Sequence, residues 1–298
     1  MQPRVLLINY DPIVDSATGT KLSLRQHWNR VDGLLDGFIS DIAECSGGQV
    51  RYQVVEQTEI NEFPIKADGF RYSANSYLDM INGRTRPHDP DLVDYQWILS
   101  NFNLLERVQN NEIDEVWLMG FPYAGFYESR MAGLGAFWCN APPLENTERC
   151  RRRFVIMGFS YERGVGEMLE NMGHRTESIM EKVYEKKRGE ANLWKRFIRY
   201  DRAAPGQAEV GNVHFAPNSE RDYDWGNRRY VSSKCDDWLN FPRLGGLARK
   251  VNCSEWGNGD IRLHHKWWLS HLPKVEGVTD GVSNNWWNYL IKIDDVMT

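Results

Sequence analysis

Tryptophan and histidine side chains are concentrated between Cys253 and Asn288. This stretch holds five of the twelve tryptophans and three of the seven histidines of the 298-residue chain. They are Trp256, Trp267, Trp268, Trp286, Trp287, His264, His265 and His271. Imidazoles titrate or bind metals near neutral pH, and indoles offer flat apolar surface beside them. The combination predicts a binding or catalytic site.

Helical geometry in this stretch would separate the histidines. A helix ending before Pro273 places His264, Trp268 and His271 on one face, whereas His265 and Trp267 project elsewhere. The face could form a metal or acid–base site with an aromatic wall. It could equally be aromatic packing with hydrogen-bonded imidazoles, and the spacing favours neither interpretation.

Another histidine, His174, lies on a predicted helix that begins near Val165 and has a clear apolar stripe. At about 100° per residue from Val165, the apolar stripe lies within roughly 60° and His174 falls at about 180°. Glutamates lie beside His174 on the same face of the helix. This face is therefore either a charged surface exposed to solvent or an inward-facing site. In the second case His174 and Glu177 could bind a metal together, with His214 or a C-terminal histidine, His265 or His271, completing the ligands.

Acidic residues follow each predicted strand of the first half. Asp11 and Glu56 follow the first two strands, and Glu128 and Glu162 follow the next two. Ligands of open α/β sheets bind beyond the carboxyl ends of the strands. Two such carboxyls with separated pKa values could hydrolyse a glycosidic bond. The candidates for acid, base or nucleophile are Asp11, Glu128 and Glu162, and Arg163 could bind an anion or a developing negative charge.

Polar and aromatic residues alternate in turn-rich segments around Asn212–Asn218 and Asp222–Asn227. Asn and Asp side chains bond sugar hydroxyls, and Trp rings stack on the C–H face of a sugar. Asp224, Trp225, Trp267 and Trp268 are therefore candidate substrate-binding residues. The alternative is a set of loops closed by Asx turns.

Three functions are compatible with these residues. The first is a hydrolase that acts on a carbohydrate polymer by carboxylate chemistry without a cofactor. The second is a hydrolase dependent on zinc or another divalent metal, such as a peptidase or amidase, in which the metal lowers the pKa of a bound water. The third is a carbohydrate-binding protein without catalytic activity.

The elements that must position these residues alternate between strand and helix. Strands are predicted over 4–9, 50–55, 114–119 and 153–157, and helices from Val31 to about Ile42, over 95–109 and after Gly166. This alternation predicts an α/β fold with a mostly parallel sheet flanked by helices. Residues 1–298 are predicted to form a single domain, in which about 205–298 make a loop-rich aromatic cap or sub-domain.

The composition limits the classes of molecule that this protein is expected to bind. A net charge of -5 with dispersed Lys and Arg argues against nucleic acid, and no apolar run is long enough to span a bilayer. The expected partner is a carbohydrate or peptide polymer.

The five cysteines are widely spaced and contain no CxxC pair, which indicates neither a dense disulfide framework nor a zinc finger. Export from the cell, with a leader absent from this sequence, is favoured slightly over a cytoplasmic location.

Overall fold

The computed structural model describes residues 1–296, which form two compact units. The first, here called the sheet unit, comprises Gln2–Gly37 and Tyr52–Gly164. The second, here called the helical unit, comprises Met1, Phe38–Arg51 and the residues from Val165 onward. The single domain predicted from the sequence stays a prediction.

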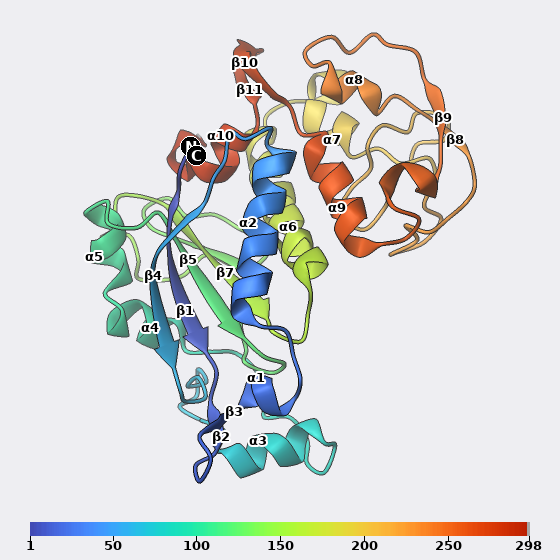
Figure 1. The fold of residues 1–298 in the computed structure, drawn as a ribbon. Coiled ribbons are helices and arrows are strands. Elements are labelled where there is room, and N and C mark those ends of the chain that lie inside the picture. Colours follow the sequence, from blue (N-terminus) through green and yellow to red (C-terminus); the bar gives the residue numbers. More distant parts are fainter. Residues whose placement is uncertain (297–298) are drawn as a thin grey trace. The chain divides into compact units, whose positions relative to one another are not determined.

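The sheet unit is built on five strands in the order β4-β1-β5-β7-β6 (Figure 1). These are β4 (Gln53–Ile60), β1 (Arg4–Tyr10), β5 (Glu115–Gly120), β7 (Phe154–Ser160) and β6 (Ser129–Ala132). The first four pair in parallel, and β6 pairs antiparallel with β7. The prediction of an α/β fold with a mostly parallel sheet is therefore confirmed.

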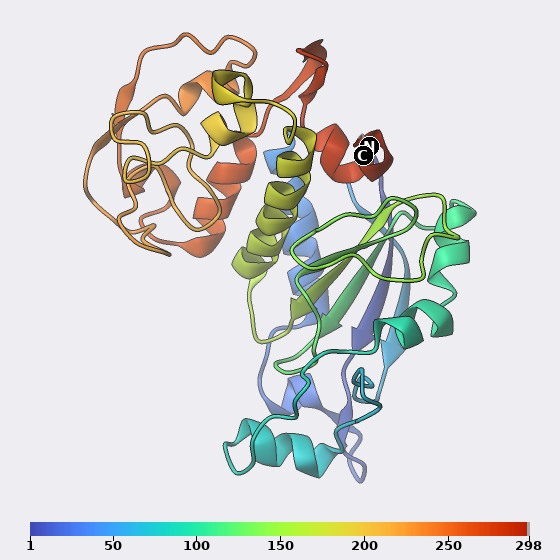
Figure 2. The same ribbon diagram turned by 180° about the vertical axis from the view of Figure 1, so that it is seen from behind.

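One face of the sheet packs against helices α4 (Tyr95–Asn101) and α5 (Leu104–Gln109) (Figure 2). The core there joins Ile8 and Val116 of the strands to Leu105 of α5. Strands β1, β5 and β7 are buried almost throughout, as expected for runs of consecutive apolar residues. Smaller elements of this unit are α3 (Ala74–Ile81) and the hairpin of β2 (Ile13–Asp15) and β3 (Thr20–Lys21), followed by α1 (Leu22–Arg25).

The structure differs from the predicted elements at several points. The single helix expected over 95–109 is two helices, because Asn103 adopts a left-handed backbone with φ 53° between them. The second strand begins at Gln53 rather than Val50. Strand β6 was not predicted, because four residues with mixed polarity carry little periodic signal.

The helical unit contains the end of α2 (Val31–Cys45) and the long helix α6 (Val165–Val183), with α9 (Ile261–Ser270) beside α6 (Figures 1 and 2). Gly166 allows this approach, because a Cβ there would lie 2.5 Å from Cγ2 of Ile261. Its other elements are α7 (Leu193–Phe197), β8 (Val231–Ser233), α8 (Asp236–Leu239), β9 (Arg249–Val251), β10 (Lys274–Thr279), β11 (Val282–Asn285) and α10 (Trp287–Ile291), with short 3-10 helices at Gly189–Ala191, Cys253–Trp256 and Ile293–Asp295.

Aromatic rings make the core of the helical unit. Trp194, Phe197, Trp238, Trp268 and Trp286 are each at most 2% exposed, and their rings pack with centroids 5.1 to 6.2 Å apart. These rings come from α7, α8, α9 and the start of α10. Several of the tryptophans near the end of the sequence therefore have a packing role.

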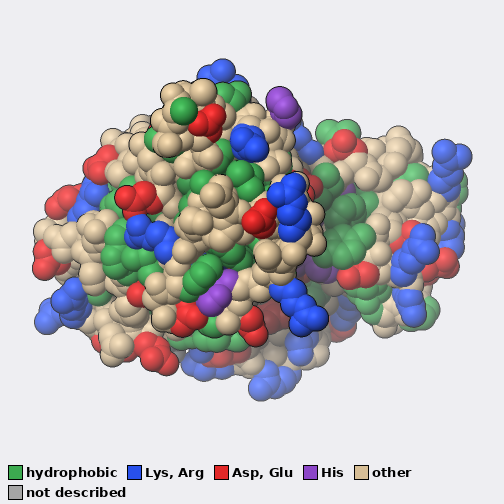
Figure 3. All heavy atoms as spheres, turned by 90° about the horizontal axis from the view of Figure 1, so that it is seen from below, with side chains coloured by type: hydrophobic (Ala, Val, Ile, Leu, Met, Phe, Trp, Pro, Cys, Tyr) green, Lys and Arg blue, Asp and Glu red, His purple; other side chains and the backbone are tan. Residues whose placement is uncertain are grey.

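Acidic and basic side chains are interspersed over the face seen in Figure 3. Within residues 1–296, no helix combines the length and apolar character needed to cross a bilayer. All five cysteines are buried.

Candidate metal centre

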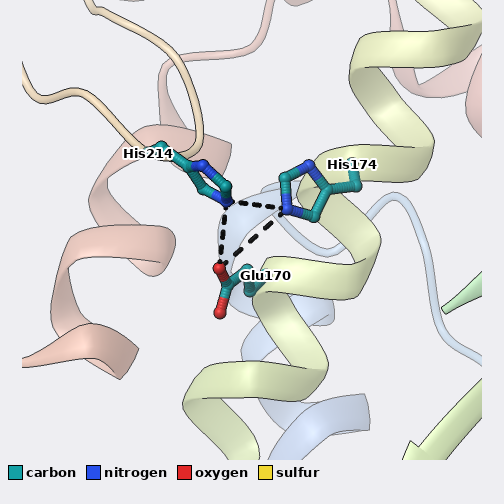
Figure 4. Close-up of side chains that lie close together, drawn as sticks. All are labelled: Glu170, His174 and His214. Carbon is teal, nitrogen blue, oxygen red and sulfur yellow. Dashed lines mark hydrogen bonds and ion pairs between the residues drawn. The ribbon is translucent and has the colours of Figure 1, made fainter. Parts of the chain in front are cut away.

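Three side chains of the helical unit point their ligand atoms at one another (Figure 4). Glu170 and His174 come from α6, and His214 comes from the loop that follows α7. The Nε2 atoms of His174 and His214 are 3.0 Å apart. Oε1 of Glu170 is 3.3 Å from Nε2 of His214 and 3.9 Å from Nε2 of His174. We call this trio the histidine–glutamate cluster.

Helix α6 places two members of the cluster on one face. Glu170 and His174 are four residues apart, so they lie one turn apart on the same side. The apolar stripe, which includes Met172 and Ile179, is buried on the other side of the helix. The glutamate and histidine side chains are only 11% and 16% exposed. The polar face of α6 is therefore turned inward at Glu170 and His174, which was one of the two possibilities that the sequence left open.

The loop carrying His214 is shaped by hydrogen bonds within the loop itself. Oδ1 of Asn212 accepts hydrogen bonds from the backbone N–H groups of His214 and Phe215, at 3.1 and 2.9 Å. Gly173 lets the loop approach, because a Cβ on this glycine would lie 2.7 Å from Cγ2 of Val213.

Two α9 side chains fix the same loop from the other side. Nε1 of Trp268 donates to the carbonyl of Gly211 at 2.9 Å, and Nε2 of His264 donates to the carbonyl of Val213 at 3.3 Å. Both rings are fully buried. The C-terminal histidines and tryptophans thus support the candidate site without forming it.

A second layer of carboxylates orients both imidazoles. Nδ1 of His174 lies 3.0 Å from Oε2 of Glu177, and Nδ1 of His214 lies 3.1 Å from Oδ1 of Asp222. The other oxygen of Glu177 accepts the backbone N–H of Val213 at 3.1 Å. A carboxylate on Nδ1 favours the tautomer with its proton there, so each imidazole in its neutral form would present the lone pair of Nε2 to a cation in the cluster.

This arrangement concentrates electron-rich atoms around one point. Two lone pairs and a carboxylate oxygen repel one another unless a cation lies between them. Accordingly, the hydrogen bond to Glu170 raises the pKa of His214. Burial works to raise the pKa of Glu170, but the hydrogen bond from His214 and the nearby histidines outweigh it and lower that pKa. A proton held here occupies the place that a metal cation would take.

The separations fit a transition metal. A circle through three atoms separated by 3.0, 3.3 and 3.9 Å has a radius of about 2.0 Å, which is the usual Zn–N and Zn–O distance. Two imidazoles and one carboxylate are also a ligand set found in catalytic zinc sites. An ion at this point would contact all three atoms without any side chain moving far.

The outer carboxylates yield a testable prediction. Replacing Glu177 with alanine should weaken zinc binding by about 10- to 100-fold, because His174 loses the partner that orients its ring. Titration calorimetry with metal-free protein would measure this. Glu181→Ala, one turn further along α6, is the matched control, and an equal loss in both variants would contradict the role given to Glu177.

The other predicted histidine ligands lie outside the histidine–glutamate cluster. Nδ1 of His265 donates to the carbonyl of Ile261, and Nδ1 of His271 donates to that of Trp267. Burial lowers the pKa of both His265 and His271 to about 4. Both therefore stay neutral at physiological pH.

His271 lies instead near Cys235 and Asp236, a second group with metal-ligand spacing. Here Arg249 already binds the carboxylate, with Nε 2.7 Å from one oxygen of Asp236 and Nη2 3.0 Å from the other. Burial also raises the pKa of the Cys235 thiol to about 11. A fixed guanidinium repels a metal cation, so this group is better explained as an ion pair.

The predicted catalytic carboxylates belong to the sheet unit and have separate partners. The two oxygens of Asp11 accept hydrogen bonds from the backbone N–H and the hydroxyl of Ser23, at 2.9 and 2.6 Å. Glu128 accepts a hydrogen bond from the side chain of Asn140. These contacts tie Asp11 to the start of α1 and Glu128 to the loop after β6.

Glu162 and Arg163 lie just beyond the carboxyl end of β7 and line a cavity of about 620 Å³. Trp28, Asp91 and Tyr123 line it as well. The cavity belongs wholly to the sheet unit, and it lies at the kind of position where open α/β sheets bind ligands.

The predicted substrate-binding residues of the helical unit are largely engaged in packing and turns. Trp225 is 6% exposed and stacks on His264, with ring centroids 4.9 Å apart. Trp267 packs on the rings of Trp256 and His271. Oδ2 of Asp224 accepts bonds from the backbone of residue 220 and the side chain of residue 227. As noted above, Trp268 has no exposed surface to offer a substrate.

Sequence reasoning missed three residues around the cluster. Glu170 lies beside His174 on the helical wheel, and the four-residue spacing was the signal that could have selected it. Asp222 and Tyr223 carry no comparable signal, because only the tertiary fold brings their loop to His214.

Fold and cluster together define an α/β protein with a candidate transition-metal centre in its helical unit. Comparison with protein-family models, with curated proteins and with solved structures found no match.

Proposed function

We propose that this protein is a metal-dependent hydrolase of the peptidase or amidase type, with zinc bound by Glu170, His174 and His214. The observation that carries the proposal is the convergence of three ligand atoms on a point about 2.0 Å from each. The second-layer carboxylates, Glu177 and Asp222, support it because metal-binding histidines are usually oriented in this way.

The number of protein ligands favours catalysis over a structural role. Structural zinc sites usually have four protein ligands, whereas catalytic sites have three and keep a position for water or substrate. Zinc lowers the pKa of a bound water to about 7, which supplies a nucleophile at neutral pH. In this proposal the residues from about 205 to 296 form an aromatic cap on α6 that carries His214, and the substrate is a peptide or another amide polymer.

Metal analysis tests the proposal directly. Protein purified without chelator should contain about one equivalent of zinc per chain, and a panel of peptides and amides should reveal turnover. A strong chelator should abolish that turnover, and added zinc should restore it. The proposal of a metal-dependent hydrolase would be ruled out if the metal-free protein kept full activity. It would also be ruled out if the protein showed no measurable binding of zinc or another divalent metal.

Hydrolysis of a carbohydrate polymer in the sheet unit is the second candidate. The cavity lined by Glu162, Arg163 and Trp28 favours it, because it combines a carboxylate and a cation with an aromatic surface. This candidate would be supported over the first if the protein hydrolysed glycans in the presence of chelator and the Glu162→Gln variant did not. Glycan binding without turnover, unchanged in that variant, would instead indicate a carbohydrate-binding protein.

A further inference from the structure

We infer that the hydroxyl of Tyr223 is the fourth ligand of the metal at the histidine–glutamate cluster. This inference rests on the proposed metal site, and it adds an oxygen ligand that substrate or water can displace. The hydroxyl proton passes to solvent when the oxygen binds the metal, so no other reactant is needed.

Distance is the first argument. The Tyr223 hydroxyl lies 3.2 Å from Nε2 of His214. Ligand atoms around a tetrahedral zinc ion are about 3.4 Å apart when each is about 2.1 Å from the metal. The 3.2 Å between the Tyr223 hydroxyl and that Nε2 is therefore close to the separation expected of two ligands of one tetrahedral ion.

The chain around His214 places the hydroxyl there through several contacts. Asp222 bonds one ring nitrogen of His214, and Tyr223 approaches the other. The backbone N–H of Tyr223 donates to the carbonyl of His214 at 3.2 Å. The two rings pack with centroids 4.4 Å apart, and Trp225 supports the tyrosine ring edge-on at 5.3 Å. Neighbouring residues thus hold both nitrogens of one imidazole.

Backbone and exposure suggest that this ligand can exchange. Tyr223 has a φ of 57°, a left-handed conformation that is unfavourable for a bulky side chain. Its side chain is also open to solvent, with 53% of the residue exposed, whereas Glu170 and His174 are largely buried. Of the four ligands, the tyrosine is therefore the one that an incoming substrate would replace most easily.

Copper(II) provides a probe, because it binds nitrogen and oxygen sites more tightly than zinc does. A phenolate bound to copper(II) absorbs visible light by charge transfer, and imidazole and carboxylate ligands do not produce this band. Metal-free protein would be loaded with one equivalent of copper(II), and its visible absorption recorded. The variants are Tyr223→Phe and, as a matched control, Tyr230→Phe, which alters another exposed tyrosine of the same unit.

The expected result is a charge-transfer band in the unaltered protein and in Tyr230→Phe, and its loss in Tyr223→Phe while one equivalent of copper stays bound. Copper bound without this band, or with a band that survives in Tyr223→Phe, would overturn the inference and leave the metal site intact. Binding of neither copper nor zinc would overturn the proposed function and the inference together. Circular dichroism of each variant confirms that it is folded.

Discussion

Replacing His214 with alanine should weaken zinc binding by roughly a hundredfold or more and abolish metal-dependent hydrolysis. Structural zinc sites have apparent binding free energies of about 10–16 kcal/mol, so one ligand of four contributes about 3 kcal/mol, roughly a hundredfold in Kd. The loss should be large because His214 is the only ligand of the cluster that does not come from α6. Without it the two α6 ligands cannot surround an ion.

Metal-free protein and calorimetry, or competition with a chromophoric chelator, would measure the change in zinc affinity. His27→Ala removes an exposed histidine of the sheet unit and serves as the control, with affinity expected to stay unchanged. Circular dichroism should show the same secondary structure in both variants. If His214→Ala retained the zinc affinity of the unaltered protein, the histidine–glutamate cluster would not be the metal site.

Replacing Trp268 with alanine should lower the free energy of unfolding by about 3–5 kcal/mol, the usual range when a large buried aromatic residue is truncated. The ring is fully buried, and it packs edge-on against Trp194 and Phe197 with centroids 6.2 and 5.6 Å away. The variant also removes the hydrogen bond from Nε1 to the carbonyl of Gly211. Urea titrations followed by circular dichroism would measure the loss.

Two further variants separate packing from general damage. Trp138→Ala removes a tryptophan that is 59% exposed, and its free energy of unfolding should change by less than about 0.5 kcal/mol. Trp268→Phe keeps most of the packing but loses the bond to Gly211, so it should destabilise less than alanine does. Should Trp268→Ala prove as stable as Trp138→Ala, the description of Trp268 as a core residue would be mistaken.

The sheet could be predicted in outline because its signals are local. The run Arg4–Asn9 and the run Asp114–Met119 are short, apolar and bounded by polar residues or breakers, and they correspond to β1 and β5. The helical stripe from Val165 identified α6 for the same reason. Boundaries were less accurate where a single backbone angle decides them, as at Asn103.

The candidate site was only partly predictable. His174 and Glu177 were selected from residue type and from their positions on a helical wheel, and His214 was selected from residue type as a ligand that could complete their site. The structure brings these three together. The C-terminal histidines were selected from composition and helical spacing, which cannot distinguish a ligand from a buried imidazole that bonds a carbonyl, as His265 and His271 do.

The sequence by itself therefore determined the four parallel strands, the helix α6 and which face of α6 is polar, because periodicity is a property of neighbouring residues. Tertiary structure decided which polar residues meet. Glu170 and Asp222 became part of the candidate site only because Gly173 admits the His214 loop and α9 holds that loop in place. Contacts between residues about 40 positions apart depend on chain packing, and no local pattern along the chain encodes them.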